Sequence, residues 1–384
     1  MLLEKIKSPA DIKNMTAEQL RLLAAEIRGG ILKRDSTIGG HVGPNLGFVE
    51  ATIALHYVFD MPEDRIVFDV SHQVYPHKML TGRAYGFIDS RRMAEVSGYS
   101  SPAESPEYDC FEIGHTSTSV ALATGLQKAR DILGGKENVV AVIGDGSLSG
   151  GEAFEGLDVA AELGTNIIIV VNDNEMSIAE NHGGLYQNLK LLRETNGKAE
   201  CNFFKSMGFD YVYLNDGNDV EKLIATFKSV KDTKHPVVVH INTLKGHGYK
   251  FAEQDKETFH WGMPFDLATG KPKVSYDGEN YSDLTAEYLL SEMKKYPEIV
   301  GITAGTPTVF GFTPERRKKA GKQFVDVGIA EEHAVALASG IATNGGKPVF
   351  GVFSTFIQRA YDQLSQDLCI NNSPATIVTF SGSV

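Results

Sequence analysis

Two polar side chains, Asp145 and Asn174, follow two apolar runs and have the chemistry of magnesium ligands. The runs, 138–143 and 167–171, are separated by a glycine-rich turn and a helical segment, so 144–174 is expected to form a βαβ unit. The carboxyl ends of parallel strands meet at the edge where ligands bind. Mg²⁺ takes one or two carboxylates plus phosphate oxygens, and glycines and a helix N-terminus accommodate a phosphate. The stretch predicts a magnesium–diphosphate site; the alternative is a plain βαβ unit with polar strand ends.

Three further loops carry histidines. The glycine-rich turn 38–47 contains His41, and four glycines there allow a ligand to approach the backbone closely. The segment 71–78 follows an expected strand and contains His72, His77 and Lys78, which suit an anionic ligand or an ordinary polar loop. The segment 114–119 contains His115, and its Thr116 or Ser117 hydroxyl is expected to cap the alanine-rich helix that follows. The alternative for His41 is a solvent-facing loop histidine.

A second key element is the run 324–334, which opens as a strand and continues as a helix. Glu331 stands in the first turn of that helix. A carboxylate is favoured at a helix N-terminus, and this alone explains a glutamate there.

The composition places limits on function. A chain of 384 residues suggests two or three domains, and 42% hydrophobic and 22% charged residues are ordinary for a globular protein. The net charge of −12 argues against non-specific nucleic-acid binding and gives no basic patch for a membrane. No apolar run has the length of a membrane span, and the N-terminus lacks an apolar signal core. Three widely spaced cysteines fit a reducing cytoplasm.

Five motifs occur in an order that resembles the 1-deoxy-D-xylulose 5-phosphate synthase family of the transketolase superfamily. They are GGHVGPNLG, FDVSHQVYPHK, GHTSTS, GDGSLSGGEAFEGLD and VVNDNEMSIAEN, of which the last two carry the thiamine diphosphate motif. The resemblance implies an α/β fold of two thiamine diphosphate-binding-type domains, each a mostly parallel sheet flanked by helices, with the second domain incomplete. The expected divisions are a diphosphate- and magnesium-binding domain at 1–265, a linker at 266–290, and the N-terminal part of a pyrimidine-binding domain at 291–384.

The resemblance also implies a role for each matching residue. The metal ligands would be Asp145, Asn174 and the backbone carbonyl of Met176. The cofactor contacts would be His72, Gly114, His115, Thr116, Gly146, Ser147, Asn174, Met176, Lys245 and Phe356. The catalytic residues would be Glu331, His41, His72, His115 and His260. In this scheme Glu331 shares a proton with the aminopyrimidine ring of the cofactor, and Phe356 stacks on that ring.

The chain departs from the family pattern in four places. The segment 182–207 replaces a long helical excursion, which puts the acceptor substrate in doubt more than cofactor binding. The family sequence AEQHA is AEEHA here, so Glu332 adds a carboxylate that could raise the pKa of either glutamate, although the two are expected to face different surroundings. A family tyrosine is Phe353. The chain also stops at Val384, inside the second domain, so we expect a truncated enzyme or half of a split one.

The leading expectation is a transferase that uses thiamine diphosphate and Mg²⁺ to condense pyruvate with glyceraldehyde 3-phosphate. It would release CO₂ and give 1-deoxy-D-xylulose 5-phosphate, a precursor of isoprenoids and thiamine. A cytoplasmic homodimer is expected from the resemblance. One alternative is a transketolase-like transfer of a two-carbon ketol unit between sugar phosphates. The other is an inactive fragment that needs a complementing C-terminal part.

Overall fold

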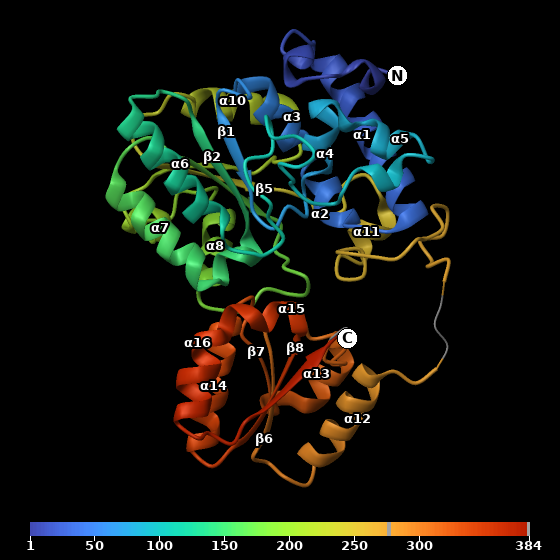
Figure 1. Cartoon of the computed structure of the whole chain (residues 1–384), viewed down its shortest axis with the longest axis vertical. Coiled ribbons are helices and arrows are strands. Elements are labelled where there is room, and N and C mark those ends of the chain that lie inside the picture. The colour runs from blue at the N-terminus through green and yellow to red at the C-terminus, as the bar shows by residue number, and fades with distance from the viewer. Residues whose placement is uncertain (275–277, 382–384) are drawn as a thin grey trace. The chain divides into compact units, whose positions relative to one another are not determined.

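The computed structural model describes residues 1–274 and 278–381, and these residues form two compact units (Figure 1). Unit 1 comprises Met1–Leu148, Glu152–Met176 and Leu185–Ser275. Unit 2 comprises Ser149–Gly151, Ser177–Gly184 and Tyr276–Val384.

Unit 1 is built on a five-stranded sheet in which all neighbouring strands are parallel. Its order is β1-β2-β3-β5-β4, with bounds β1 Arg65–Phe68, β2 Val139–Gly144, β3 Ile168–Asp173, β4 Asp210–Leu214 and β5 Val237–Asn242. The central strands are rich in valine and isoleucine because both of their faces are buried. Alternate residues of β2 enter opposite cores, Val140 and Val142 on one face and Ala141 and Ile143 on the other.

Helices cover both faces of this sheet (Figure 1). The core that contains Val140 also receives residues of α1 (Ala17–Ile38), α3 (Val49–Val58) and α10 (Val220–Val230). The core that contains Ala141 receives residues of α6 (Ser119–Leu133), α7 (Gly151–Leu163) and α8 (Leu185–Glu194). Five short helices complete the unit: α2 (Val42–Gly47), α4 (Tyr75–Lys78), α5 (Tyr85–Ile88), α9 (Phe203–Ser206) and α11 (Lys250–Gln254).

The βαβ unit predicted over 144–174 is confirmed. β2 and β3 pair in parallel with Gly144 opposite Asn172, so the two strands end at the same level. A 3₁₀ turn, Asp145–Ser149, and helix α7 connect them. The residues that follow each strand therefore lie at one edge of the sheet.

Unit 2 contains a four-stranded parallel sheet in the order β7-β6-β8-β9. The strands are β6 Ile299–Thr303, β7 Phe324–Asp326, β8 Lys347–Phe353 and β9 Thr376–Phe380. The helices are α12 (Tyr281–Met293), α13 (Pro314–Ala320), α14 (Glu331–Thr343), α15 (Ser354–Ile357) and α16 (Tyr361–Gln363). Two apolar cores form in this unit, one around α14 and one around α12. The α/β class with parallel sheets flanked by helices is thus confirmed.

Two local expectations were wrong. The glycine-rich segment 38–47 is not only a turn, because it contains the buried helix α2. Thr116 and Ser117 do not cap α6, whose N-cap is Thr118 and which begins at Ser119. Helix α12 begins at Tyr281 because Asn280 caps it by accepting a hydrogen bond from the Asp283 amide, so the last part of the stretch 266–290 is helical.

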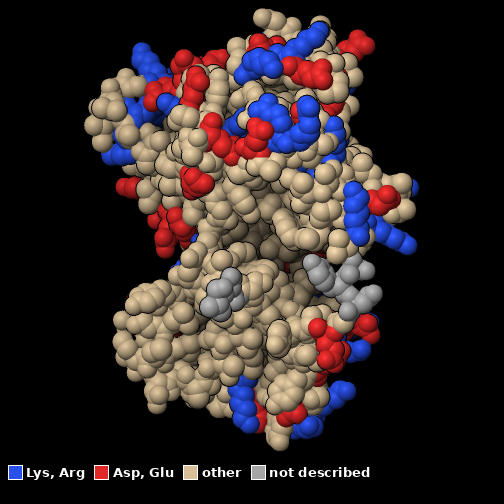
Figure 2. Space-filling view, turned by 45° about the vertical axis from the view of Figure 1, so that its right-hand side comes forward, with Lys and Arg blue, Asp and Glu red and all other residues tan. Residues whose placement is uncertain are grey.

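Within the described residues, we find no helix with the length and apolar character needed to cross a bilayer. Charged side chains are unevenly distributed over the visible surface (Figure 2). In that view much of unit 2 carries neither Lys, Arg, Asp nor Glu, and its charged residues gather along the lower and right-hand margins. Exposed apolar side chains of this unit include Tyr361 and Ile370.

Candidate functional site

The predicted metal ligands Asp145 and Asn174 directly follow the paired strands β2 and β3. Both are buried, and within the part of the chain that the structure describes the Asn174 side-chain oxygen, Oδ1, accepts no hydrogen bond. A buried acceptor without a donor costs free energy unless a ligand satisfies it. Met176 is half-buried in the turn after Asn174. A carboxylate, an amide oxygen and a backbone carbonyl are suitable donors for Mg²⁺, so these residues fit the implied metal.

The ligand set of Asp145, Asn174 and the Met176 carbonyl differs from metal sites that are built only from His, Cys, Asp or Glu side chains. The described residues include no group of three or more His, Cys, Asp or Glu side chains that could hold a metal ion. A site with one carboxylate leaves room for phosphate oxygens, which is how Mg²⁺ is commonly held with its substrates.

The turn after β2 is joined to the loop that carries His115. The Ser117 hydroxyl donates to the carbonyl of Ser147, at 2.8 Å. The fully buried Asp69 carboxylate accepts from the amides of Ser117, at 2.9 Å, and Ser119, at 3.0 Å. Asp69 therefore satisfies the first amide of α6 from another part of the chain, which explains why no local hydroxyl caps this helix.

The predicted cofactor contacts of this region lie in these two segments. Gly146 and Ser147 are buried in the turn after β2. His115 and Thr116 are half-buried in the loop before α6, and Gly114 is exposed there.

Backbone strain concentrates in these same loops. Val70 and Ser71, just after β1, have φ of 61° and 69°, Ser117 has 76°, and Glu175, beside Asn174, has 65°. Such angles are unusual for residues with a side chain, and for a β-branched valine they are a genuine outlier. Strain of this kind persists only where surrounding contacts hold it, and it is concentrated at functional sites.

Three of the predicted histidines form one cluster in unit 1. The ring centroids of His41 and His72 are 5.9 Å apart, those of His41 and His260 5.7 Å, and those of His72 and His260 5.6 Å. Lys245 joins the cluster, with its Nζ 3.1 Å from Nδ1 of His260, and is almost completely buried. The structure thus brings together four residues, of which the first, His41, and the last, His260, are 219 positions apart in the sequence.

Burial sets the charge state of this cluster. It is the main cause that lowers the pKa of His41 to about 4 and of His72 to about 3, with Lys245 adding to both effects. Burial also lowers the pKa of Lys245 to about 7. At neutral pH the two imidazoles are uncharged, so each ring can donate one hydrogen bond and accept another. An anion bound beside Lys245 would favour its charged form.

Backbone hydrogen bonds hold the segments of the cluster together. Gly40, directly before His41, and Gly262, two residues after His260, exchange two hydrogen bonds at 2.9 and 3.0 Å. The amide of Gly43 donates to the carbonyl of Phe259 at 2.7 Å. A Cβ atom at Gly43 would lie 2.9 Å from that carbonyl oxygen, so this close approach requires glycine.

Lys78 does not serve as the expected contact for an anion. It is fully buried and donates to Glu104 at 2.7 Å and to the Ser97 hydroxyl at 3.1 Å. A buried ammonium group needs a charged partner, and Glu104 supplies it. Of the polar residues in 71–78, His72 therefore belongs to the histidine cluster, whereas Lys78 has a structural role.

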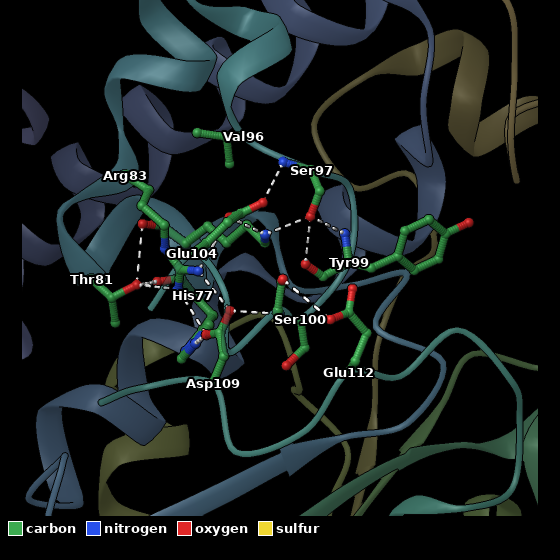
Figure 3. A network of polar contacts seen from close by, with 12 residues as sticks. His77, Thr81, Arg83, Val96, Ser97, Tyr99, Ser100, Glu104, Asp109 and Glu112 are labelled. Atoms are coloured by element: carbon green, nitrogen blue, oxygen red, sulfur yellow. Dashed lines mark hydrogen bonds and ion pairs between the residues drawn. The ribbon is translucent and has the colours of Figure 1, made fainter. Parts of the chain in front are cut away.

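His77 also belongs to the network of Figure 3 rather than to the cluster. Its Nε2 lies 2.8 Å from the carboxylate of Asp109. Arg83 donates two hydrogen bonds, of 2.6 and 2.8 Å, to the same carboxylate. The irregular segment 96–112 is thereby fixed although it has little regular secondary structure.

Tyr99 is a neighbour of the site that sequence reasoning missed. Its ring meets that of His41 edge to face, with centroids 6.0 Å apart, and the side chain is partly exposed. Ser97 fixes the backbone here by donating its hydroxyl to the Tyr99 carbonyl at 3.0 Å (Figure 3). The sequence gives no signal for this contact, because the segment has no periodic pattern.

In unit 2, Glu331 is the first residue of α14 and is 1% exposed. Burial is the main cause that raises its pKa to about 7, and the neighbouring Glu332 contributes least. Arg359 lies 3.7 Å from the Glu331 carboxylate and donates to Glu332 at 3.1 Å. The two glutamates share this arginine but differ in burial, since the Glu331 side chain is 1% exposed and that of Glu332 is 31% exposed.

Phe356, predicted to stack on a pyrimidine ring, lies in α15 directly after β8. Its ring contacts that of Phe353 edge to face, with centroids 5.1 Å apart. The phenylalanine that replaces the family tyrosine thus packs against the predicted stacking residue.

The pairing of Lys78 with Glu104 can be tested by substitution. Glu104→Gln leaves a buried ammonium group without its carboxylate and should lower the free energy of unfolding by about 3 kcal/mol. Glu95→Gln, which breaks the solvent-exposed pair with Arg92, is the matched control and should leave stability unchanged. Urea unfolding measures both variants, and equal stability of the two would contradict the role given to Glu104.

The raised pKa of Glu331 has a consequence for stability. Between its unfolded pKa of 4.5 and its folded pKa of about 7, the unfolded chain releases a proton that the folded chain retains, so this residue lowers stability as pH rises. Glu331→Gln should therefore stabilise the protein by about 2–3 kcal/mol at pH 8, and by much less at pH 5. Calorimetric unfolding at both pH values measures the difference.

Glu315→Gln is the matched control, since Glu315 is an exposed glutamate in the first turn of another helix of unit 2. It should give no such gain. A Glu331→Gln variant whose added stability is the same at both pH values would refute the pKa assignment.

The chain matches two family models. The model described as 1-deoxy-D-xylulose-5-phosphate synthase matches residues 3–201 and 195–243. The model described as the pyrimidine-binding domain of transketolase matches residues 278–384.

Curated proteins named 1-deoxy-D-xylulose-5-phosphate synthase are similar over the whole chain. 1-Deoxy-D-xylulose-5-phosphate synthase 1 from Geobacter sulfurreducens is 41% identical over 420 aligned residues. This alignment covers 100% of this chain and 66% of that protein. The Dictyoglomus thermophilum protein is 42% identical over 421 residues, including 98% of this chain and 66% of that protein. The chain thus spans about two thirds of the length of these relatives.

Solved transketolase structures share the fold. The enzyme from Leishmania mexicana has a TM-score of 0.52 at 17% identity, covering 95% of this chain and 68% of that chain. The enzyme from Campylobacter jejuni has a TM-score of 0.52 at 15% identity, and the match covers 95% of this chain and 70% of that chain. At these identities the likeness concerns the fold alone, whereas the sequence matches identify the chain as a member of the 1-deoxy-D-xylulose-5-phosphate synthase family.

Proposed function

We propose that this chain binds thiamine diphosphate with Mg²⁺ and catalyses the condensation of pyruvate with glyceraldehyde 3-phosphate to 1-deoxy-D-xylulose 5-phosphate and CO₂. The observation that carries the proposal is the pair Asp145 and Asn174 at adjacent strand ends, with the buried Asn174 oxygen free of a donor within the described residues. Family membership supports the choice of reaction. In this proposal, 1–265 is the diphosphate-binding domain, 266–290 a linker and 291–384 part of the pyrimidine-binding domain.

The residues of unit 1 would hold the diphosphate end of the cofactor. Asp145, Asn174 and the Met176 carbonyl would bind Mg²⁺, which in turn neutralises phosphate oxygens. The amides of Gly146 and Ser147, in the turn that leads into α7, are suited to binding phosphate. Gly114, His115 and Thr116 would contribute from the loop that Ser117 ties to Ser147. When bound, thiamine diphosphate supplies a carbon nucleophile and an electron sink for the decarboxylation.

The histidine cluster would bind the substrate through hydrogen bonds and take part in catalysis. Uncharged His41 and His72 can each donate a hydrogen bond to an oxygen of a substrate and accept another hydrogen bond at the other nitrogen. His260 is held by Lys245, whose ammonium form would balance a phosphate or carboxylate. His115 would act with them from its loop.

Glu331 would hold the proton that the pyrimidine ring of the cofactor requires. A carboxyl group with a pKa of about 7 is protonated to a large extent at neutral pH and can donate a hydrogen bond to a ring nitrogen. Phe356 would supply an aromatic face for the same ring.

We also propose that the protein is a cytoplasmic homodimer. The support is the cysteine pattern, together with the surface of unit 2 that carries few charges in Figure 2. Light scattering after size exclusion should give twice the chain mass of 41.8 kDa, and a monomer at micromolar concentration would contradict the dimer.

Two measurements test the reaction. Calorimetric titration of thiamine diphosphate into the chain with Mg²⁺ should show binding that EDTA abolishes. The chain should then release ¹⁴CO₂ from carboxyl-labelled pyruvate, faster when glyceraldehyde 3-phosphate is present. Glu331→Ala should abolish this turnover and leave binding of Mg²⁺ and the diphosphate largely intact, because its proposed contact is with the pyrimidine ring.

The outcomes separate the alternatives. Two-carbon transfer from a ketose phosphate without CO₂ release would favour the transketolase-like reaction. Cofactor binding without turnover, restored by a C-terminal part of a relative, would favour a fragment that needs complementation. Absence of Mg²⁺-dependent cofactor binding would refute the proposal.

A further inference from the structure

Helix α8 lies just before the place where this chain is shorter than the family model. The synthase model matches in two pieces that overlap at 195–201, and the alignment to the Geobacter sulfurreducens protein runs over 420 residues against 384 here. The residues 185–194 just before this overlap form α8, which packs Leu189 and Leu192, both fully buried, into the core of unit 1. This helix is therefore an integral part of the unit.

One end of α8 contacts the turn after β3. Arg193 donates through Nη1 to the fully buried carboxylate of Asp173 at 2.6 Å. His240 lies 2.8 Å from the same carboxylate oxygen, and the other oxygen accepts from the amide of Glu175 at 3.1 Å. Asp173 and Glu175 are the two chain neighbours of Asn174, so this carboxylate fixes the backbone on both sides of the proposed ligand.

The other end of α8 contacts the turn after β2. The Tyr186 hydroxyl lies 3.1 Å from the carbonyl oxygen of Asp145 and 3.4 Å from that of Gly146. Tyr186 and Arg193 are seven residues apart, which places them on one face of the helix, two turns from each other. A single helix face therefore reaches both halves of the metal- and diphosphate-binding motif.

We propose that Tyr186 and Arg193 are positioning residues that set the geometry of Asp145 and Asn174 for Mg²⁺ and diphosphate. The inference rests on the proposed function and adds to it that helix α8 supports the cofactor site. Neither side chain needs to touch the metal. Each acts through the backbone or the carboxylate next to a ligand, and the loss of such outer contacts typically weakens metal binding 10–100-fold.

The test compares Mg²⁺ affinity at saturating thiamine diphosphate, measured by calorimetry on the full chain without substrate. Arg193→Met should raise the Mg²⁺ concentration for half-saturation about tenfold or more. Arg193→Lys retains a cation beside Asp173 and should recover most of that loss. Tyr186→Phe, which keeps the ring and removes only the hydroxyl, should raise the same concentration at least threefold with an unchanged melting temperature.

Lys190→Met is the matched control on the same helix, because Lys190 is exposed and pairs only with Glu194 among the ion pairs of the described residues. It should leave Mg²⁺ affinity unchanged. If the unmodified chain binds the cofactor and Tyr186→Phe and Arg193→Met bind Mg²⁺ equally well, this inference is wrong while the proposed function stands. If the unmodified chain does not bind the cofactor, the proposed function fails first.

Discussion

The parallel pairing of β2 with β3 is the constraint on which the rest of unit 1 depends. Because Gly144 lies opposite Asn172, two turns leave the sheet at one level and carry Asp145 and Asn174 to neighbouring positions. The strands can be apolar along most of their length because helices bury both of their faces. Polar side chains lie at the strand ends, where the buried carboxylates of Asp69 and Asp173 fix the loops.

Burial also tunes titratable groups within each of the two units. It keeps His41 and His72 uncharged, lowers the pKa of Lys245 to about 7 and raises that of Glu331 to about 7. Charged groups that have no part in chemistry are instead paired, as Lys78 is with Glu104. Strongly shifted pKa values of this kind mark candidate functional residues.

Part of this could be predicted from local sequence. Apolar runs and a glycine turn suffice for the βαβ unit of 144–174. Glu331 could be placed in the first turn of a helix by the same kind of local pattern. The fold class was expected from the family resemblance of the five motifs.

The parts that could not be predicted depend on partners distant in the chain. Asp69 satisfies the start of α6 from 50 residues away, so a search for a capping hydroxyl near Ser119 gives the wrong residue. Lys78 resembles an anion ligand until Glu104, in an aperiodic segment, is seen beside it. The role of α8 was missed because Arg193 and Tyr186 lie outside every recognisable motif.

The most direct test of this account is a crystal structure of the chain with thiamine diphosphate and Mn²⁺ in place of Mg²⁺. The account predicts an anomalous Mn²⁺ peak within coordination distance of the Asp145 carboxylate and the Asn174 side-chain oxygen, with the diphosphate on the turn 145–149. A bound cofactor whose Mn²⁺ lies elsewhere, or whose diphosphate does not contact this turn, would contradict it.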